Sequence, residues 1–319
     1  MSALDILISY VIREEDGTDP AKKFFGSLRK FPTGTPAALQ VSVKCGNPKF
    51  LDQIRKIFDE NVKGLNISVE HMPDSGFDLG SHYLVARQNP DVILIFMSAS
   101  SQATCPNWLY LLASPFTQSH IGAVGCLLSF ESIRDSYLES VRTRIKSKFS
   151  LKLTDFELAT AIAREMNISK IQMQLGPFGN YAARLLAKLS FYLLRNKEPL
   201  NYSGSFPAFP NPHLRTTGFA VRANLLLLTF DRYPQYKHEA FQYESGYSSF
   251  SRRIVNLGYR VLHCDYDGNY EDFDQVSKPT SFRVQKGRSL VSDRESRRFH
   301  SLEPENQIAL NKITFGARD

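Results

Sequence analysis

The sequence predicts an α/β protein with a mixed, mostly parallel sheet flanked by helices. Over roughly the first 100 residues, short runs rich in Val, Ile and Leu alternate with segments of helical periodicity, and this order is typical of parallel sheets covered on both faces. The chain has 319 residues, of which 42% are hydrophobic and 22% are charged, so it can bury a sizeable core without disulfides or a structural metal. The sequence has no glycine period and no heptad period, which excludes collagen-like and coiled-coil folds.

Seven segments have the length and apolar composition of buried strands. They are residues 4–12, 39–44, 65–71, 91–97, 121–128, 217–222 and 260–264. The spacing of apolar residues predicts helices around residues 24–28 and at 48–62, 82–88, 106–112, 223–228 and 250–257. Ligands of such sheets bind at the carboxyl ends of the parallel strands, and we expect the site there.

The distribution of charge suggests how the chain is divided. The net charge is +7, and residues 142–198 alone hold 11 Lys and Arg against 4 Asp and Glu. We expect a basic helical insertion at residues 131–201 between a first half (1–130) and a second half (202–275), followed by a basic tail (276–319). A basic block attracts phosphates, nucleic acid or an anionic membrane surface without distinguishing among them.

One helix predicted within this insertion, residues 180–195, is amphipathic. Its leucines share one face, and Arg184, Lys188 and Arg195 share another. Such a helix either packs its leucines on a core or lies on an anionic membrane. We favour packing on the core and keep peripheral contact with the inner face of a membrane as the alternative.

Several protein classes are disfavoured by missing motifs. The four cysteines are far apart and lack CxxC spacing, which indicates reduced thiols and a cytoplasmic protein. The sequence contains no recognisable signal peptide and no apolar run long enough to span a bilayer. It also lacks GxGxxG after the first strand and GxxxxGK[ST] throughout, which argues against dehydrogenases and P-loop enzymes.

Three stretches of the chain form a recognisable series. The first is DVILIFMSASSQATCPNWL (91–109), which ends in a Pro-x-Trp-Leu helix start containing Trp108. The second, FPNPHLRTTGFAVRANLLL (209–227), contains a Thr-Gly pair. In the third, HEAFQYESGYSSFSRRIVNLGYRVL (238–262), an acidic residue precedes an Arg-bearing helix. Together they resemble GT-A fold glycosyltransferases of the family 2 type, including an uncharacterised bacterial subgroup.

The resemblance implies a GT-A fold and transfer of a sugar, with inversion, from a nucleotide-diphosphate donor to a saccharide or lipid-linked acceptor. It assigns the general base to Glu244, and Glu239 in the same acidic turn is the rival. A glutamate at the start of a helix also favours the helix dipole without any catalytic role. The acceptor pocket would be formed around Thr217, Gly218 and Trp108.

The donor side of the site is assigned to residues at four places in the chain. Ser9 and Tyr10 end the first predicted strand, Asp74 and Asp78 follow the third, Ser98 and Ser100 follow the fourth, and Arg252 and Arg253 lie in the helix predicted at 250–257. Tyr10 either stacks on the nucleobase or packs in the core. Asp74 and Asp78 belong to PDSGFDLG, which either binds the nucleotide sugar or forms a glycine-rich turn with a helix cap.

Two further residues lie in NPHLRT (211–216), within the second half. Arg215 is suited to bidentate binding of a phosphate. His213 either orients the acceptor or packs within the loop. Both are assigned to the acceptor side of the site.

The expected metal site departs from the family pattern. Ser98-Ala99-Ser100 stands where the family carries DxD-type carboxylates that hold Mg²⁺ or Mn²⁺, and hydroxyls are poor ligands for these ions. Three alternatives stay open. A divalent metal is held from elsewhere, with His263 and Asp265 as candidate ligands, or the enzyme is metal-independent, or the chain is a non-catalytic nucleotide-sugar-binding relative.

The basic balance of the chain also raises a different class, a nucleic-acid-binding protein. The sequence contains no recognisable nucleic-acid-binding module, and its basic residues are not interleaved with aromatic residues expected to be exposed. We therefore expect no nucleic-acid partner.

Overall fold

The structure is a computed structural model that describes residues 4–59, 62, 64–136, 205–277, 281–285 and 287–315. The chain forms two units, one of Met1–Glu131 with Pro210–Asp319 and one of Ser132–Phe209. Residues 142–198, which carry the predicted basic excess and the amphipathic helix, lie outside the described residues.

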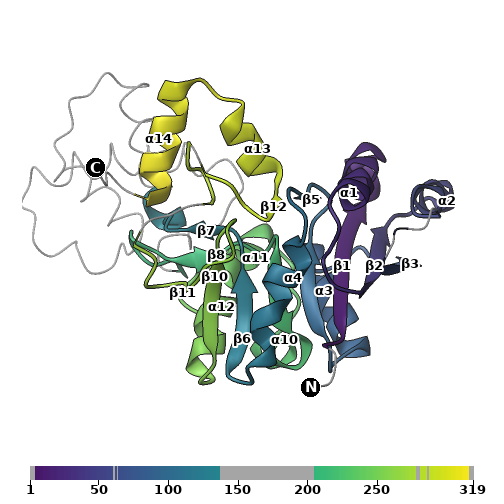
Figure 1. Cartoon of the computed structure of the whole chain (residues 1–319), viewed down its shortest axis with the longest axis horizontal. Coiled ribbons are helices and arrows are strands. Elements are labelled where there is room, and N and C mark those ends of the chain that lie inside the picture. Colours follow the sequence, from purple (N-terminus) through teal and green to yellow (C-terminus); the bar gives the residue numbers. More distant parts are fainter. Residues whose placement is uncertain are drawn as a thin grey trace, which may run out of the picture. The chain divides into compact units, whose positions relative to one another are not determined.

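An eight-stranded mixed sheet forms the centre of the first unit, in the order β11-β10-β6-β9-β4-β1-β2-β3 (Figure 1). The strands β1 to β4 pair in parallel, and so do β6 and β10, whereas β9 and β11 run antiparallel to their neighbours. This arrangement confirms the predicted α/β class with a mostly parallel sheet. The eight strands are β1 (Ile6–Arg13), β2 (Ala37–Lys44), β3 (Leu65–His71), β4 (Ile93–Met97), β6 (Ile121–Gly125), β9 (Phe219–Arg222), β10 (Arg260–Cys264) and β11 (Tyr270–Asp272).

Both faces of the sheet are covered, and β4 shows why its sequence is continuously apolar. Ile93, Ile95 and Met97 belong to one buried cluster, while Leu94 and Phe96 belong to the other, because successive side chains of a strand point to opposite faces. The first cluster includes residues of α1 (Asp19–Lys30), α2 (Pro48–Ile57) and α4 (Trp108–Ala113). The second includes residues of α3 (Phe77–Gln88), α10 (Ala223–Thr229), α11 (Lys237–Ser245) and α12 (Phe250–Asn256).

Several element boundaries differ from the prediction. The helix α3 begins at Phe77 rather than at residue 82, because Gly76 adopts the left-handed conformation (φ 68°) and directly precedes the helix. The acidic turn predicted around Glu239 is the helix α11 instead. The Glu239 carboxylate accepts hydrogen bonds from the backbone N–H groups of Gln235 and Tyr236, and these bonds satisfy donors that would otherwise be unpaired.

The predicted basic tail folds as part of the first unit. Its β12 (Val291–Ser292) pairs antiparallel with β5 (Gln102–Ala103), just after the loop that follows β4. Two helices follow, α13 (Arg294–His300) and α14 (Pro304–Phe315) (Figure 1).

The remaining short elements lie where the chain turns or leaves the first unit. They are the 3₁₀ turns η1 (Glu14–Asp16) and η2 (Ser114–Thr117) and the strands β7 (Leu128–Ser129) and β8 (His213–Leu214), which pair antiparallel. In the second unit, Ser132 Oγ donates to the Pro207 carbonyl at 2.7 Å. Within the described ranges, no helix combines the length and the hydrophobicity needed to cross a bilayer.

A buried lysine holds the turn between β3 and α3. The side chain of Lys44 is fully buried, and its Nζ donates to the carbonyl oxygens of Ser75 (2.8 Å) and Phe77 (2.7 Å). Burial lowers the pKa of this amine, and Asp74, 3.6 Å away, opposes the effect. Lys44 therefore fixes the entry into α3, which forms one wall of the pocket described below.

We expect Lys44→Met to lower the free energy of unfolding by about 2 kcal/mol, because two carbonyl groups lose their donor. Urea denaturation measures this change. The exposed Lys49 provides the control, since Lys49→Met should change stability by less than about 0.5 kcal/mol. A Lys44→Met protein as stable as the wild type would contradict the structural role of the amine.

Candidate functional site

A pocket of about 370 Å³ opens where the parallel strands end. Its walls come from the end of β1, the start of α3, the loop after β4, the segment before β9, α11 and the start of α13. Because β9 runs antiparallel to β4, the residues before β9 and those after β4 meet at this one edge of the sheet. The volume suits a small-molecule ligand.

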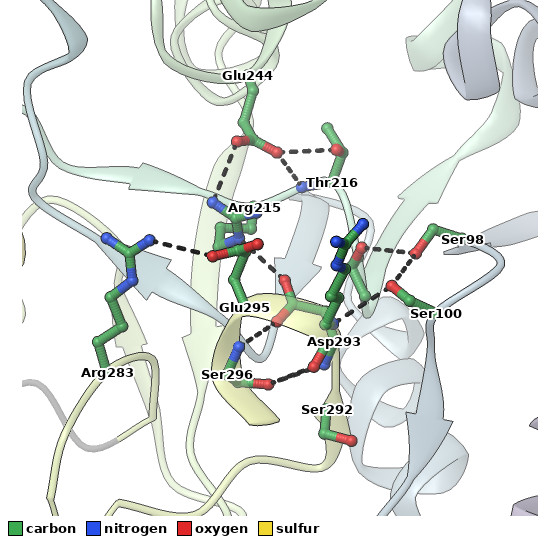
Figure 2. Close-up of polar contacts among 12 residues, drawn as sticks. Ser98, Ser100, Arg215, Thr216, Glu244, Arg283, Ser292, Asp293, Glu295 and Ser296 are labelled. Atoms are coloured by element: carbon green, nitrogen blue, oxygen red, sulfur yellow. Dashed lines mark hydrogen bonds and ion pairs between the residues drawn. The ribbon is translucent and has the colours of Figure 1, made fainter. Parts of the chain in front are cut away.

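Charged side chains linked by ion pairs form the wall of the pocket between α11 and α13 (Figure 2). The Arg215 guanidinium lies 3.5 Å from Glu244 Oε1 and 3.3 Å from Asp293 Oδ2. The other carboxylate oxygen of Glu244 accepts hydrogen bonds from the backbone N–H (2.9 Å) and the hydroxyl (2.8 Å) of Thr216. Glu244 is thus held from two sides, with 15% of its side chain exposed and lining the pocket.

These contacts determine the ionisation state of Glu244 and Arg215. Burial alone would raise the pKa of the Glu244 carboxyl. The Arg215 guanidinium outweighs this effect, with help from His213 and Thr216, and holds that pKa below its ordinary value. Burial likewise favours the neutral form of Arg215, but Glu244 and Asp293 raise the pKa of its guanidinium. Glu244 is therefore an anion at neutral pH.

Hydroxyl groups gather in the loop after β4. The Oγ atom of Ser98 lies 3.4 Å from that of Ser100, 3.2 Å from that of Ser101 and 3.4 Å from Thr217 Oγ1. The backbone N–H of Arg294 donates to Ser100 Oγ at 3.3 Å. This loop therefore presents hydroxyls rather than carboxylates to the pocket.

An ion pair lines another part of the pocket. Arg13, the last residue of β1, donates to Asp78 Oδ1 at 3.0 Å. Enclosure raises the pKa of the Asp78 carboxyl, although 41% of its side-chain surface is accessible. The cations of Arg13 and Lys44 offset part of this effect.

Six of the residues named from the sequence line this pocket. They are Glu244, Asp78, Ser98, Ser100, Arg215 and Thr217. They come from α3, the loop after β4, the segment before β9 and α11, and these four segments meet at the same edge of the sheet. The other residues named from the sequence do not line this pocket.

The two aromatic residues expected at the site are in the core. The Tyr10 ring stacks on Phe24 at 4.0 Å, and its hydroxyl donates to the Ala99 carbonyl. Both Tyr10 and Trp108 are fully buried, and burial raises the pKa of the Tyr10 phenol above its ordinary value. The Tyr10 ring therefore has no face open to a nucleobase, and Trp108 has none open to an acceptor.

Three residues near the proposed base have structural partners. Glu239 caps α11 and pairs with Arg232 at 2.6 Å. The ring of His213 is buried, with Nδ1 lying 2.8 Å from the Asn211 carbonyl. Gly218 has φ 64°, and a Cβ there would lie 2.5 Å from Cys126 Sγ, so this position requires glycine.

The helix arginines hold backbone turns. Arg252 donates to the Gly246 carbonyl and to Asn211 Oδ1, while Arg253 donates to the carbonyls of Ser248 and Thr229. Neither lines the pocket. Asp74 is 76% exposed and pairs with Lys44.

The candidate metal ligands His263 and Asp265 are engaged separately. His263 is buried, its Nε2 lies 3.1 Å from Ser281 Oγ, and burial lowers its pKa to about 4. The Asp265 carboxylate accepts from the backbone N–H groups of Asp267 and Asn269 within its own turn. In the described part of the chain, no group of three or more His, Cys, Asp or Glu is arranged to hold a metal.

Several residues that line the pocket were not named from the sequence. Four of them have basic side chains: Arg13, His82, Lys237 and Arg294. The Asp293-Arg294-Glu295-Ser296 segment carries a helix-cap signal, since Asp293 Oδ1 accepts from the Ser296 N–H at 2.7 Å. That signal locates the start of a helix but not its position beside Ser100.

His82 lines the pocket as a neutral ring. Its Nδ1 is 2.8 Å from the Oγ of the fully buried Ser9, and the ring stacks on Phe96 at 4.1 Å. Burial lowers the pKa of His82 from 6.5 to about 3. Ser9 therefore positions His82 and does not face the pocket itself.

Comparison with known proteins shows likeness only at the level of solved structures. No family model and no curated protein matches the chain. Mouse xyloside xylosyltransferase 1 aligns over 82% of this chain and 85% of its own, with 7% identity and a TM-score of 0.38. Core-mannan synthase A (CmsA/Ktr4) from Aspergillus fumigatus aligns over 81% and 70%, with 10% identity and a TM-score of 0.36.

Two further likenesses are partial. This chain spans 23% of GalNAc-T7, solved with UDP, GalNAc and Mn²⁺, at 15% identity and a TM-score of 0.29. It spans 41% of the mannosyltransferase PcManGT from Pyrobaculum calidifontis, solved with GDP-Man and Mn²⁺, at 14% identity and a TM-score of 0.30. The matches cover 40% and 44% of this chain. Because all four TM-scores lie below 0.5, the activity of this chain has to be argued from its own site.

The buried His82 predicts a loss of stability on acidification. The unfolded chain binds a proton below pH 6.5, whereas the folded chain resists it down to about pH 3. Stability attributable to this group is therefore present at pH 7 and falls as the pH drops, by about 2 kcal/mol at pH 5. Between these two pH values, we expect the wild type to lose about 2 kcal/mol more than His82→Gln in urea denaturation.

The exposed His120 provides the matched control for this measurement. His120→Gln should follow the pH dependence of the wild type. An equal loss of stability in His82→Gln and the wild type would show that His82 is not buried as a neutral ring.

Proposed function

We propose that this protein transfers a sugar from a nucleotide-diphosphate sugar to a hydroxyl group of an acceptor, with Glu244 as general base. The observation that carries the proposal is an ionised carboxylate fixed at the wall of a polar pocket, at the carboxyl ends of parallel strands. The sequence resemblance to GT-A glycosyltransferases, which also points to Glu244, supports the same assignment.

Glu244 meets the geometric requirement for a base. One carboxylate oxygen faces Arg215 and the other accepts from Thr216, so the group has one orientation. An acceptor hydroxyl within hydrogen-bonding reach of this carboxylate would lose its proton as its oxygen bonds to the anomeric carbon. One acidic group suffices when the attack comes from the face opposite the leaving diphosphate, and we therefore propose inversion.

The walls of the pocket suit a sugar nucleotide. The carboxylate of Asp78 and the hydroxyls of Ser98 and Ser100 provide acceptors and donors for sugar hydroxyls. Lys237 and Arg294 add positive charge for phosphate. We propose a saccharide or lipid-linked acceptor that enters past Thr217 and α11. Nucleotide binding without turnover would favour the non-catalytic alternative.

We expect Glu244→Gln to lower transfer by about 10²-fold or more while nucleotide binding and fold are kept, because an amide cannot take the proton. The measurement is release of nucleoside diphosphate from a panel of UDP- and GDP-sugars, in the presence of mixed mono- and disaccharide acceptors.

Glu239→Gln is the matched control on the same helix. Its loss weakens the cap of α11 and should lower stability by about 1 kcal/mol, with transfer nearly unchanged. An active Glu244→Gln protein together with an inactive Glu239→Gln protein would move the base to Glu239.

A further inference from the structure

The loop after β4 has no suitable donor set for a divalent cation. Its hydroxyls from Ser98, Ser100 and Ser101 hydrogen-bond to one another and to Thr217. Neutral hydroxyls are weak ligands for Mg²⁺ and Mn²⁺, which prefer carboxylate oxygens. The residues present therefore do not fit the metal that the family resemblance implies.

The carboxylates that line the pocket are already engaged. Asp78 pairs with Arg13 at 3.0 Å, and Asp16 Oδ2 accepts from the Arg13 backbone N–H at 3.0 Å. Both oxygens of Glu244 have partners, as described above. Recruiting these carboxylates to a metal would require breaking these contacts, which again disfavours a metal at this position.

The C-terminal segment brings positive charge to the same loop. The pairing of β12 with β5 seats the segment beside the loop. The Arg294 N–H donates to Ser100 Oγ, and the Arg297 guanidinium donates to the Ser100 carbonyl at 2.7 Å. Asp293 lies between β12 and Arg294 in the chain and forms an ion pair with Arg215. These contacts fix the backbone of Arg294 directly on the hydroxyl loop.

Two of the cations lining the pocket remain available. Arg13 and Arg215 form ion pairs with carboxylates. Lys237 on α11 and Arg294 on α13 are exposed and make no ion pair with any described residue. The Nζ atom of Lys237 lies 5.6 Å from the centroid of the Phe241 ring. Both side chains line the pocket, one from each of two helices.

We propose that Arg294 and Lys237 bind the diphosphate of the donor and take the place of a divalent metal. The inference rests on the proposed function and specifies how its leaving group is held. In the transfer, the bond between the anomeric carbon and the diphosphate oxygen breaks, and its electron pair stays on that oxygen. The acceptor oxygen bonds to the anomeric carbon, and its proton passes to Glu244. The guanidinium and the ammonium meet the negative charge that develops on the nucleoside diphosphate.

The experiment is calorimetric titration of the full chain with UDP, GDP and inorganic pyrophosphate, in EDTA and again in Mn²⁺. We expect at least one nucleoside diphosphate to bind in EDTA with an affinity within about twofold of that in Mn²⁺. Arg294→Gln and Lys237→Gln should each weaken this binding by about 10-fold, since each removes a charge-assisted contact. The double variant should lose about 100-fold, and Arg294→Lys should retain part of the affinity.

Arg298→Gln is the matched control, because Arg298 is exposed on the same helix and does not line the pocket. Its affinity should equal that of the wild type, and thermal melting should show that all variants are folded. Nucleotide binding that requires Mn²⁺, or a double variant with wild-type affinity, would overturn the inference and leave the proposed function standing.

Another result would support the cationic diphosphate site but contradict the proposed transferase function. Binding of pyrophosphate through Arg294 and Lys237, without binding of any nucleoside diphosphate, would keep the cationic site and remove the proposed function. Absence of all binding in both EDTA and Mn²⁺ would overturn both.

Discussion

The arrangement of the pocket depends on the guanidinium of Arg215. It bridges Glu244 on α11 and Asp293 before α13, and it lies over the Phe282 ring at 4.6 Å. A charge that is largely removed from water needs partners, and removing one of them from a buried pair costs about 3–5 kcal/mol. The segment before β9, the helix α11 and the C-terminal segment are therefore held to one another through this side chain.

The ion pair with Arg215 affects both the position and the basicity of the Glu244 carboxylate. Arg215 fixes the carboxylate in one place, which favours reaction by positioning. Its positive charge also lowers the pKa of the carboxyl, and a weaker base gains less from accepting a proton. For the base that we propose, positioning is therefore favoured over basicity.

The sequence was informative where local pattern decides structure. The strands 65–71 and 260–264 agree in both bounds with β3 and β10, because apolar runs between turns are local signals. Glu244 was named because it matches the acidic residue before the Arg-bearing helix, and Arg215 because an arginine in NPHLRT is suited to binding a phosphate. Tyr10 was left with two roles, and packing against Phe24 decided between them. That contact spans two elements and has no local signature.

The parts of the site that were missed arise from long-range pairing. Lys237 belongs to α11, which Glu239 caps. Glu239 was considered from the sequence only as the rival general base. Arg294 reaches the loop after β4 only through the pairing of β12 with β5. No spacing rule connects Ser100 to a residue so far along the chain, so neither the cations nor their arrangement followed from motif reasoning.

The contact between Ser100 and Arg294 spans 194 positions, and this separation affects how the protein is made. On the ribosome, the first four parallel strands are complete when residue 97 has emerged, and chains fold from the N-terminal part during synthesis. The loop after β4 then lacks its contact with Arg294 while about 190 further residues are added, at roughly 5–20 residues per second. A nascent chain therefore passes through a period of about ten seconds or more in which the first four parallel strands have been made but Arg294, which contacts the loop after β4, has not.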